Sequence, residues 1–152
     1  MERCIACDLM NGIAELPGGQ IYTTDFWVVE HCIGPFGVGS LIIKPKRHCI
    51  HYWELTNEET YEIGPLLKLV SDVIQSILKA DQVYICLWSH MNWKPCHIHF
   101  LLQPVWGNMV NEFPRNGAYL QIEMAKRKHF PDRDKVEEFV LKAKQRIQEI
   151  KE

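Results

Sequence analysis

Two histidines separated by one apolar residue, His97 and His99, have the spacing in this sequence that best suits chemistry. A neutral imidazole can act as a nucleophile, as a general base or as a metal ligand. Side chains on a strand alternate between its two faces, so both histidines, Leu101 and Gln103 are expected on one face. The opposite face would pack into a core through Ile98, Phe100 and Leu102. For so short a motif, a buried, hydrogen-bonded histidine beside a surface histidine is the simpler interpretation.

A second group of potential ligands, Cys4 and Cys7, forms a Cys-x-x-Cys motif near the N-terminus. Two thiolates at this spacing can reach one tetrahedral ion, which indicates half of a zinc site. The alternative is a redox dithiol of the thioredoxin kind. That motif needs a preceding strand, and only three residues precede Cys4. Half a zinc site requires two further ligands, which the histidines would supply.

The composition is that of an ordinary globular protein of 152 residues, with 47% apolar and 24% charged residues, and predicts one domain. The formal net charge of -2 gives no general basic surface for nucleic acid. No apolar run approaches the roughly 20 residues that span a bilayer, and the N-terminus lacks a signal-peptide pattern. We therefore expect a cytoplasmic protein whose six cysteines are thiols or metal ligands rather than disulfides.

Two segments in the first third of the chain are typical of strands. Residues 20–30 are rich in β-branched and aromatic side chains, and residues 40–43 form a short apolar run. The second segment leads into a basic stretch, residues 44–47. That stretch would be either a solvated turn or a source of positive potential near an anionic ligand.

A long helix is expected after Thr56, which has the sequence of an N-cap with Glu59 completing a capping box. Apolar residues follow at helical spacing as far as Leu78. Gly64-Pro65 falls inside this pattern and should produce a kink or two abutting segments. A similar apolar spacing after Pro131 predicts a C-terminal helix with a solvated charged face.

The segments that flank the histidine motif complete the expected fold. Residues 81–88 read as a strand, residues 105–117 as a loop, and residues 119–126 are ambiguous. The resulting order is strands, a helix, two strands and a helix. This order predicts an α+β domain with a mainly antiparallel sheet.

Together these segments resemble the histidine triad (HIT) family of nucleotide hydrolases and transferases, close to its diadenosine tetraphosphate hydrolase-like bacterial branch. The resemblance covers residues 4–106 and rests on three segments around the capped helix: Cys4-Ile-Ala-Cys7, Gly39-Ser-Leu-Ile-Ile-Lys-Pro-Lys-Arg-His48 and His97-Ile-His99-Phe-Leu-Leu-Gln-Pro104. It implies a HIT-like fold with a five-stranded antiparallel sheet, one long central helix and a C-terminal helix. Residues 1–152 would form one such domain, with a core at 4–106 and a C-terminal helical extension at 118–152.

The family pattern is His-φ-His-φ-His-φ-φ, where φ is apolar, and its middle histidine is the nucleophile. The resemblance assigns that role to His99, which would attack the α-phosphorus and form a nucleotidyl-histidine that water hydrolyses. Such an intermediate divides one difficult displacement into two easier ones. The implied activity is cleavage of a phosphoanhydride or phosphoramidate in a nucleotide, for example a dinucleoside polyphosphate.

The resemblance also implies a structural zinc ion, because several family members bind one through equivalent residues: Cys4, Cys7, His48 and His97. His51 would replace His48 if the loop register differed. Four protein ligands make a closed, structural site, whereas three ligands and a water would make an open catalytic one. Family members usually join their sheets edge to edge, so a homodimer is expected.

Several positions depart from the family pattern. Leu101 occupies the third triad position and can neither donate a proton nor bind a phosphate, although Gln103 on the same face could partly compensate. Glu30 is the carboxylate nearest the position that usually binds ribose. In place of the family's phosphate-binding run before the first triad histidine, this sequence has Asn92, Trp93 and Lys94. These residues would either bind substrate or only pack the loop. The alternative function is therefore a zinc-stabilised module that binds nucleotides or phosphates with little or no turnover.

Overall fold

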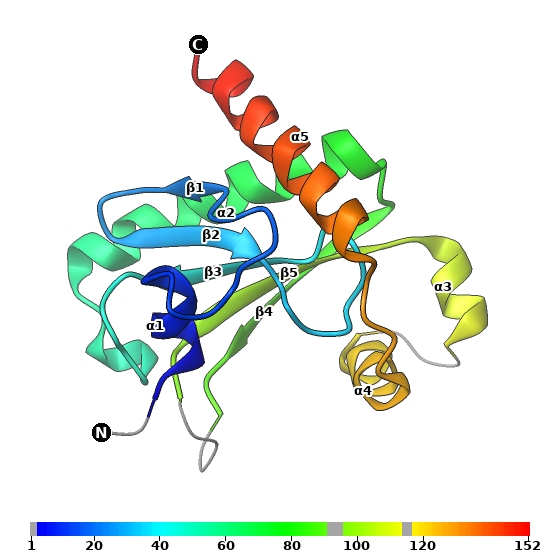
Figure 1. Ribbon diagram of the computed structural model, residues 1–152, viewed down its shortest axis with the longest axis horizontal. Coiled ribbons are helices and arrows are strands. Elements are labelled where there is room, and N and C mark those ends of the chain that lie inside the picture. The colour runs from blue at the N-terminus through cyan, green and yellow to red at the C-terminus, as the bar shows by residue number, and fades with distance from the viewer. Residues whose placement is uncertain (1–2, 91–95, 114–116) are drawn as a thin grey trace.

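A computed structural model describes residues 3–90, 96–113 and 117–152. The fold is built on one five-stranded sheet in which every neighbouring pair is antiparallel, in the order β1-β2-β3-β5-β4. The strands are β1 (Tyr22–Thr23), β2 (Trp27–His31), β3 (Leu41–Pro45), β4 (Gln82–Trp88) and β5 (His99–Val105). The helices are α1 (Ile5–Met10), the 3-10 turn η1 (Tyr52–Glu54), α2 (Asn57–Leu78), α3 (Gly107–Glu112), α4 (Ala118–Arg127) and α5 (Arg133–Lys151). This architecture confirms the predicted α+β fold (Figure 1).

The long helix α2 begins at the predicted capping box. The Glu59 amide donates to the Thr56 hydroxyl at 3.2 Å, and the Thr56 amide donates to the Glu59 carboxylate at 2.7 Å, so two amides at the helix start are satisfied. The helix then continues through Pro65 as one element rather than as two abutting segments. In Figure 1, α2 runs behind the sheet.

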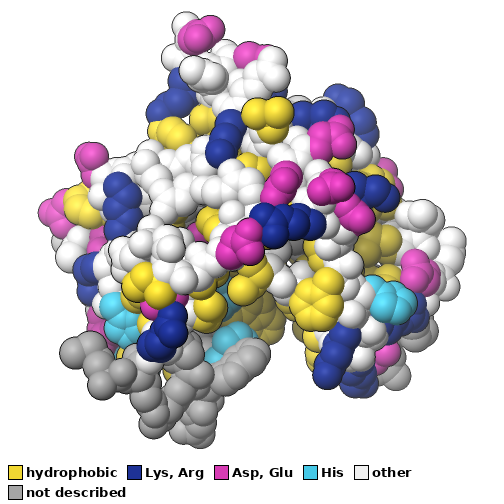
Figure 2. Space-filling view, in the orientation of Figure 1, with side chains coloured by type: hydrophobic (Ala, Val, Ile, Leu, Met, Phe, Trp, Pro, Cys, Tyr) yellow, Lys and Arg dark blue, Asp and Glu magenta, His cyan; other side chains and the backbone are white. Residues whose placement is uncertain are grey.

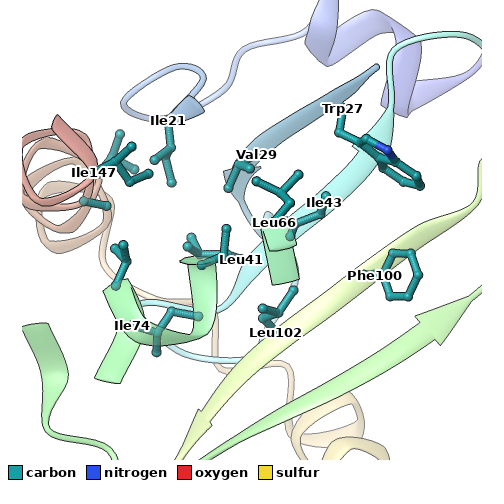
Figure 3. Packing of buried hydrophobic residues seen from close by; sticks show 14 of the residues in the cluster. Ile21, Trp27, Val29, Leu41, Ile43, Leu66, Ile74, Phe100, Leu102 and Ile147 are labelled. Atoms are coloured by element: carbon teal, nitrogen blue, oxygen red, sulfur yellow. The ribbon is translucent and has the colours of Figure 1, made fainter. Parts of the chain in front are cut away.

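The main core lies between the sheet and the two long helices, α2 and α5. Leu66 and Ile74 of α2 face Leu41 and Leu102 of the sheet in the close-up view (Figure 3). Trp27 is fully buried in this core, and its indole nitrogen donates to the Glu59 carbonyl at 2.9 Å. Burying each such side chain stabilises the fold by roughly 1.5–3 kcal/mol. The core therefore holds β5 with Phe100 and Leu102 inward, as the alternation predicts.

The opposite face of the sheet is covered in part by α4. Leu120 packs with Val105 and Phe113 in a second, smaller apolar cluster. The expected loop at 105–117 is wrong where α3 forms, and the ambiguous segment 119–126 is the helix α4. Helices as short as these depend on tertiary packing rather than on local propensity, so the sequence pattern alone does not reveal them.

The C-terminal helix α5 confirms the predicted helix and its buried stripe. The Asp132 side chain accepts hydrogen bonds from the amides of Asp134 and Lys135 at 3.0 and 3.3 Å and caps the helix. No helix within the described ranges has the length and apolar character needed to cross a membrane.

Candidate functional site

Four sulfur and nitrogen ligands meet beside the start of β5. Cys4 and Cys7 are at the N-terminal end of α1, His48 follows β3, and His97 precedes β5. One potential ligand atom from each residue lies within 4.8 Å of those of the other three. Segments that are 41 to 93 residues apart in the chain are thus joined at one point.

The distances in this cluster fit a tetrahedral zinc ion. The Nδ1 atom of His97 is 3.6 Å from the sulfur of Cys4 and 3.6 Å from that of Cys7. The Nδ1 atom of His48 is 3.5 Å from the Cys7 sulfur. With Zn–S near 2.3 Å and Zn–N near 2.0–2.1 Å, tetrahedral geometry separates sulfur from nitrogen by about 3.6 Å. Cys4, Cys7, His48 and His97 therefore could hold a metal ion together.

The His97 ring is fixed in the tautomer that a metal requires. Its Nε2–H donates to the Pro45 carbonyl at 3.0 Å, which leaves the Nδ1 lone pair directed at the cysteines. Burial lowers the pKa of His97 to about 4, so the ring is neutral at pH 7. Burial and the neighbouring Cys4 thiol raise the pKa of Cys7 to about 11. A bound cation would displace that proton and pair with the thiolate.

His51, the predicted substitute for His48, lies outside this cluster. Its ring stacks on Trp53 with 4.3 Å between ring centroids, and its backbone amide donates to Glu54 at 3.2 Å. The loop register therefore assigns His48, rather than His51, to the metal cluster.

His99 is the first residue of β5 and is half-buried. Its Nδ1–H faces the His97 carbonyl at 2.9 Å, and donation there leaves the lone pair on Nε2 for attack on an electrophile. Burial lowers the pKa of the imidazole, and the nearby charges of His90 and Lys44 lower it further. The ring is therefore held neutral, which is the nucleophilic form.

No family model matches the sequence, and no curated protein sequence matches it significantly. Similarity to solved structures is nevertheless extensive. A hypothetical histidine triad nucleotide-binding protein from Sulfolobus tokodaii is 20% identical, with a TM-score of 0.73 over 97% of this chain and 94% of that one. A zinc-bound histidine triad family protein from Mycobacterium smegmatis is 20% identical, with a TM-score of 0.70 over 97% and 95%. A Hit-like protein from Bartonella henselae is 13% identical, with a TM-score of 0.69 over 93% and 95%.

The chain has the histidine triad (HIT) fold. At these identities the likeness establishes the fold alone, and the diadenosine tetraphosphate hydrolase-like branch receives no specific support.

Glu30 lies on the same face of the HIT sheet as His99, but it is only 2% exposed. The Lys44 ammonium donates to one of its carboxylate oxygens, and Lys44 itself is 1% exposed. The other oxygen, Oε2, has no hydrogen-bond partner among the described residues. Glu30 thus uses one oxygen in a buried ion pair, which differs from an exposed ribose-binding carboxylate.

The sequence analysis grouped Lys44 with a basic stretch after the strand, whereas the structure places it inside β3. Ile43 pairs with Phe100, so the antiparallel register brings Lys44 beside His99. The available signal was alternation within β3, which puts Lys44 on the same face as Ile42.

The side chains that follow His99 on the same face of β5 are buried and have almost no access to solvent. Leu101 is 2% exposed and lies between Ile42 and Cys86 in the sheet. Gln103 is fully buried, and its amide nitrogen lies 2.9 Å from the Met124 sulfur on α4. Any contact between Gln103 and a ligand would require α4 to move. The other substrate-binding candidates lie outside the described residues: Asn92, Trp93 and Lys94.

The space-filling view shows a hollow between the part of the HIT fold that carries α1 and the part that carries α4, with histidine side chains visible beside it (Figure 2). A separate cavity of about 790 Å³ lies on the α2 side of the sheet, between β1 and α2, and contains none of the predicted site residues. The sheet face that carries His99 therefore remains the candidate site.

Proposed function

We propose that this protein binds a nucleotide and cleaves its phosphoanhydride or phosphoramidate bond through a covalent intermediate on His99. The orientation of that ring carries the proposal: Nδ1 faces the His97 carbonyl and Nε2 is available. Dinucleoside polyphosphates and nucleoside phosphoramidates are the proposed substrate classes.

The test is to incubate the protein with both substrate classes and to search for a nucleotidyl adduct by peptide mass spectrometry. Wild-type protein should carry the adduct on His99, and His99→Ala should lose the adduct and at least about 10³-fold in turnover. His129→Ala is the matched control, since His129 is an exposed histidine between α4 and α5. Full activity of His99→Ala would refute the proposal.

A binding module with little turnover is the second candidate function. Leu101 favours it, because a leucine cannot protonate a leaving group. The buried Glu30–Lys44 pair also favours it, since this carboxylate is not exposed to bind ribose. Ligand binding measured by calorimetry, without product formation across the same panel, would support the module and exclude the enzyme.

We also propose a structural zinc ion bound by Cys4, Cys7, His48 and His97. Zinc would tie α1 to the end of β3 and the start of β5, which stabilises the strand that carries His99. Four side chains whose ligand atoms all lie within 4.8 Å of one another favour a closed site over an open catalytic one. The thiols need a reducing compartment, which is consistent with a cytoplasmic location.

The proposed assembly is a homodimer formed through β4, the longer of the two edge strands of the sheet. Unpaired edge strands favour pairing with a second chain, and Ile85 and Leu87 on β4 are 47% and 40% exposed. Sedimentation should give a dimer for the wild type and a monomer for the Ile85→Lys/Leu87→Lys variant. Leu141→Lys, at an exposed position of α5, should remain dimeric.

A further inference from the structure

We propose that His90 is a second catalytic residue, which protonates the leaving group when His99 attacks and then activates the water that releases the nucleotide. This inference rests on the proposed function, because it requires the covalent intermediate on His99. It supplies the proton transfer for which Leu101, at the third triad position, has no chemical means.

His90 lies next to the nucleophile in space although it is nine positions away in the sequence. The centroids of the His90 and His99 rings are 5.9 Å apart, and the ring planes are tilted by 55°. Attack distances are about 3–3.5 Å and hydrogen bonds to a transferred proton about 2.6–3.2 Å. A phosphoryl group can therefore contact both imidazoles at once.

The position of His90 is fixed by its neighbours. Its ring stacks on Trp88 at 5.9 Å with 14° between the planes, and Trp88 pairs with His99 across β4 and β5. The Ser89 hydroxyl donates to the Ile50 carbonyl, and the Cys96 thiol donates to the His90 carbonyl. A group held in this way can be pre-organised for proton transfer.

The other polar groups near His99 are less suitable for this role. Lys44 is fully buried and donates to Glu30. Gln103 carries no titratable proton and lies beneath α4. Cys86 accepts a hydrogen bond from Gln121 at 3.3 Å, also at the α4 side of the sheet. His90, in contrast, is half-buried and adjoins the nucleophilic ring.

The proposed reaction has two steps. In the first step, the Nε2 lone pair of His99 forms a bond to the α-phosphorus. The bond from phosphorus to the leaving oxygen or nitrogen breaks, the leaving atom keeps the electron pair, and protonated His90 transfers its proton to that atom. In the second step, water attacks phosphorus, its proton passes to neutral His90, and the electron pair of the P–N bond returns to His99. His90 ends protonated, ready for another cycle.

Substrates that differ only in the leaving group provide the test. Adenosine 5′-(p-nitrophenyl phosphate) releases nitrophenolate, which needs no proton, whereas an adenosine 5′-phosphoramidate of an alkylamine must be protonated to leave. The rate of adduct formation on His99 is measured for both by rapid quench near neutral pH, where an imidazole can still carry the proton that it donates. His90→Ala should lose about 10²-fold or more on the phosphoramidate and less than about 5-fold on the nitrophenyl ester, and its adduct should persist longer than that of wild type.

Equal losses of adduct formation on both substrates would assign His90 a structural role, and unchanged rates would exclude any role. Either result overturns the inference about His90 and leaves His99 as the nucleophile. Absence of an adduct in wild-type protein with both substrates would instead overturn the proposed function, and the inference with it. His129→Ala serves again as the control and should behave as wild type.

Discussion

The two ends of β5 differ in how completely their polar side chains are paired. At the start, Cys4, Cys7, His48 and His97 converge at spacings that one tetrahedral ion would satisfy. Further along, Gln103 is buried beneath α4 with its Oε1 lacking a partner among the described residues, and its amide meets only a sulfur atom. The difference shows that the polar side chains at the start of β5 could share one ion, whereas the polar side chain at the α4 end is buried in a packing surface. His99 is the first residue of β5 and lies two positions after His97.

The largest expected effect comes from breaking the metal cluster. Cys7→Ser should abolish zinc binding and greatly lower the thermal stability, since structural zinc contributes roughly 10–16 kcal/mol of binding free energy in small zinc-finger peptides. Elemental analysis by mass spectrometry and thermal denaturation would measure both changes. Cys86→Ser is the matched control, because Cys86 lies on β4 outside the cluster. Unchanged stability after complete metal removal would show that the start of β5 needs no ion.

A smaller effect is expected at the buried ion pair beside His99. Lys44→Met should lower the free energy of unfolding by about 3–5 kcal/mol, because it leaves the Glu30 carboxylate buried and unpaired. The double variant Lys44→Met/Glu30→Leu should recover most of this loss, since it removes both charges. Urea denaturation of the two single variants and the double variant completes a thermodynamic cycle. If the double variant is no more stable than Lys44→Met, the pair is not an isolated electrostatic unit.

The smallest effect is expected at the α4 end. Gln103→Leu removes an amide whose oxygen is unsatisfied among the described residues and should change the free energy of unfolding by no more than about 1 kcal/mol in either direction. Denaturant unfolding measures this difference, and Gln82→Leu at the exposed start of β4 is the comparison. A loss above about 3 kcal/mol would mean that this end, too, depends on specific polar pairing.

Local patterns were enough to predict much of the fold. The capping box at Thr56 and Glu59 depends on residues three apart, and the apolar spacings that follow it depend on one helix. The alternation in β5 correctly placed Phe100 and Leu102 in the core. Caps and apolar spacings can be recognised in the sequence because each depends only on residues that are close together in the chain.

The candidate metal ligands were a harder case, because their residues are far apart. Spacing alone suggested only the cysteine pair, and the resemblance to the HIT family supplied His48 and His97. The structure brings all four together. The ligand chemistry was thus readable from residue types, whereas the choice of His48 over His51 depended on the loop after β3.

By itself, the sequence determined the α+β class, the central and C-terminal helices and the residue types able to bind zinc or attack phosphorus. Only the tertiary structure decided that α3 and α4 form, that Lys44 pairs with Glu30, and that His90 adjoins His99. Each of these three features depends on strand register or on packing between distant segments. Such contacts are not encoded in a local period or cap, because their free energy comes from surfaces that meet only after the chain has folded.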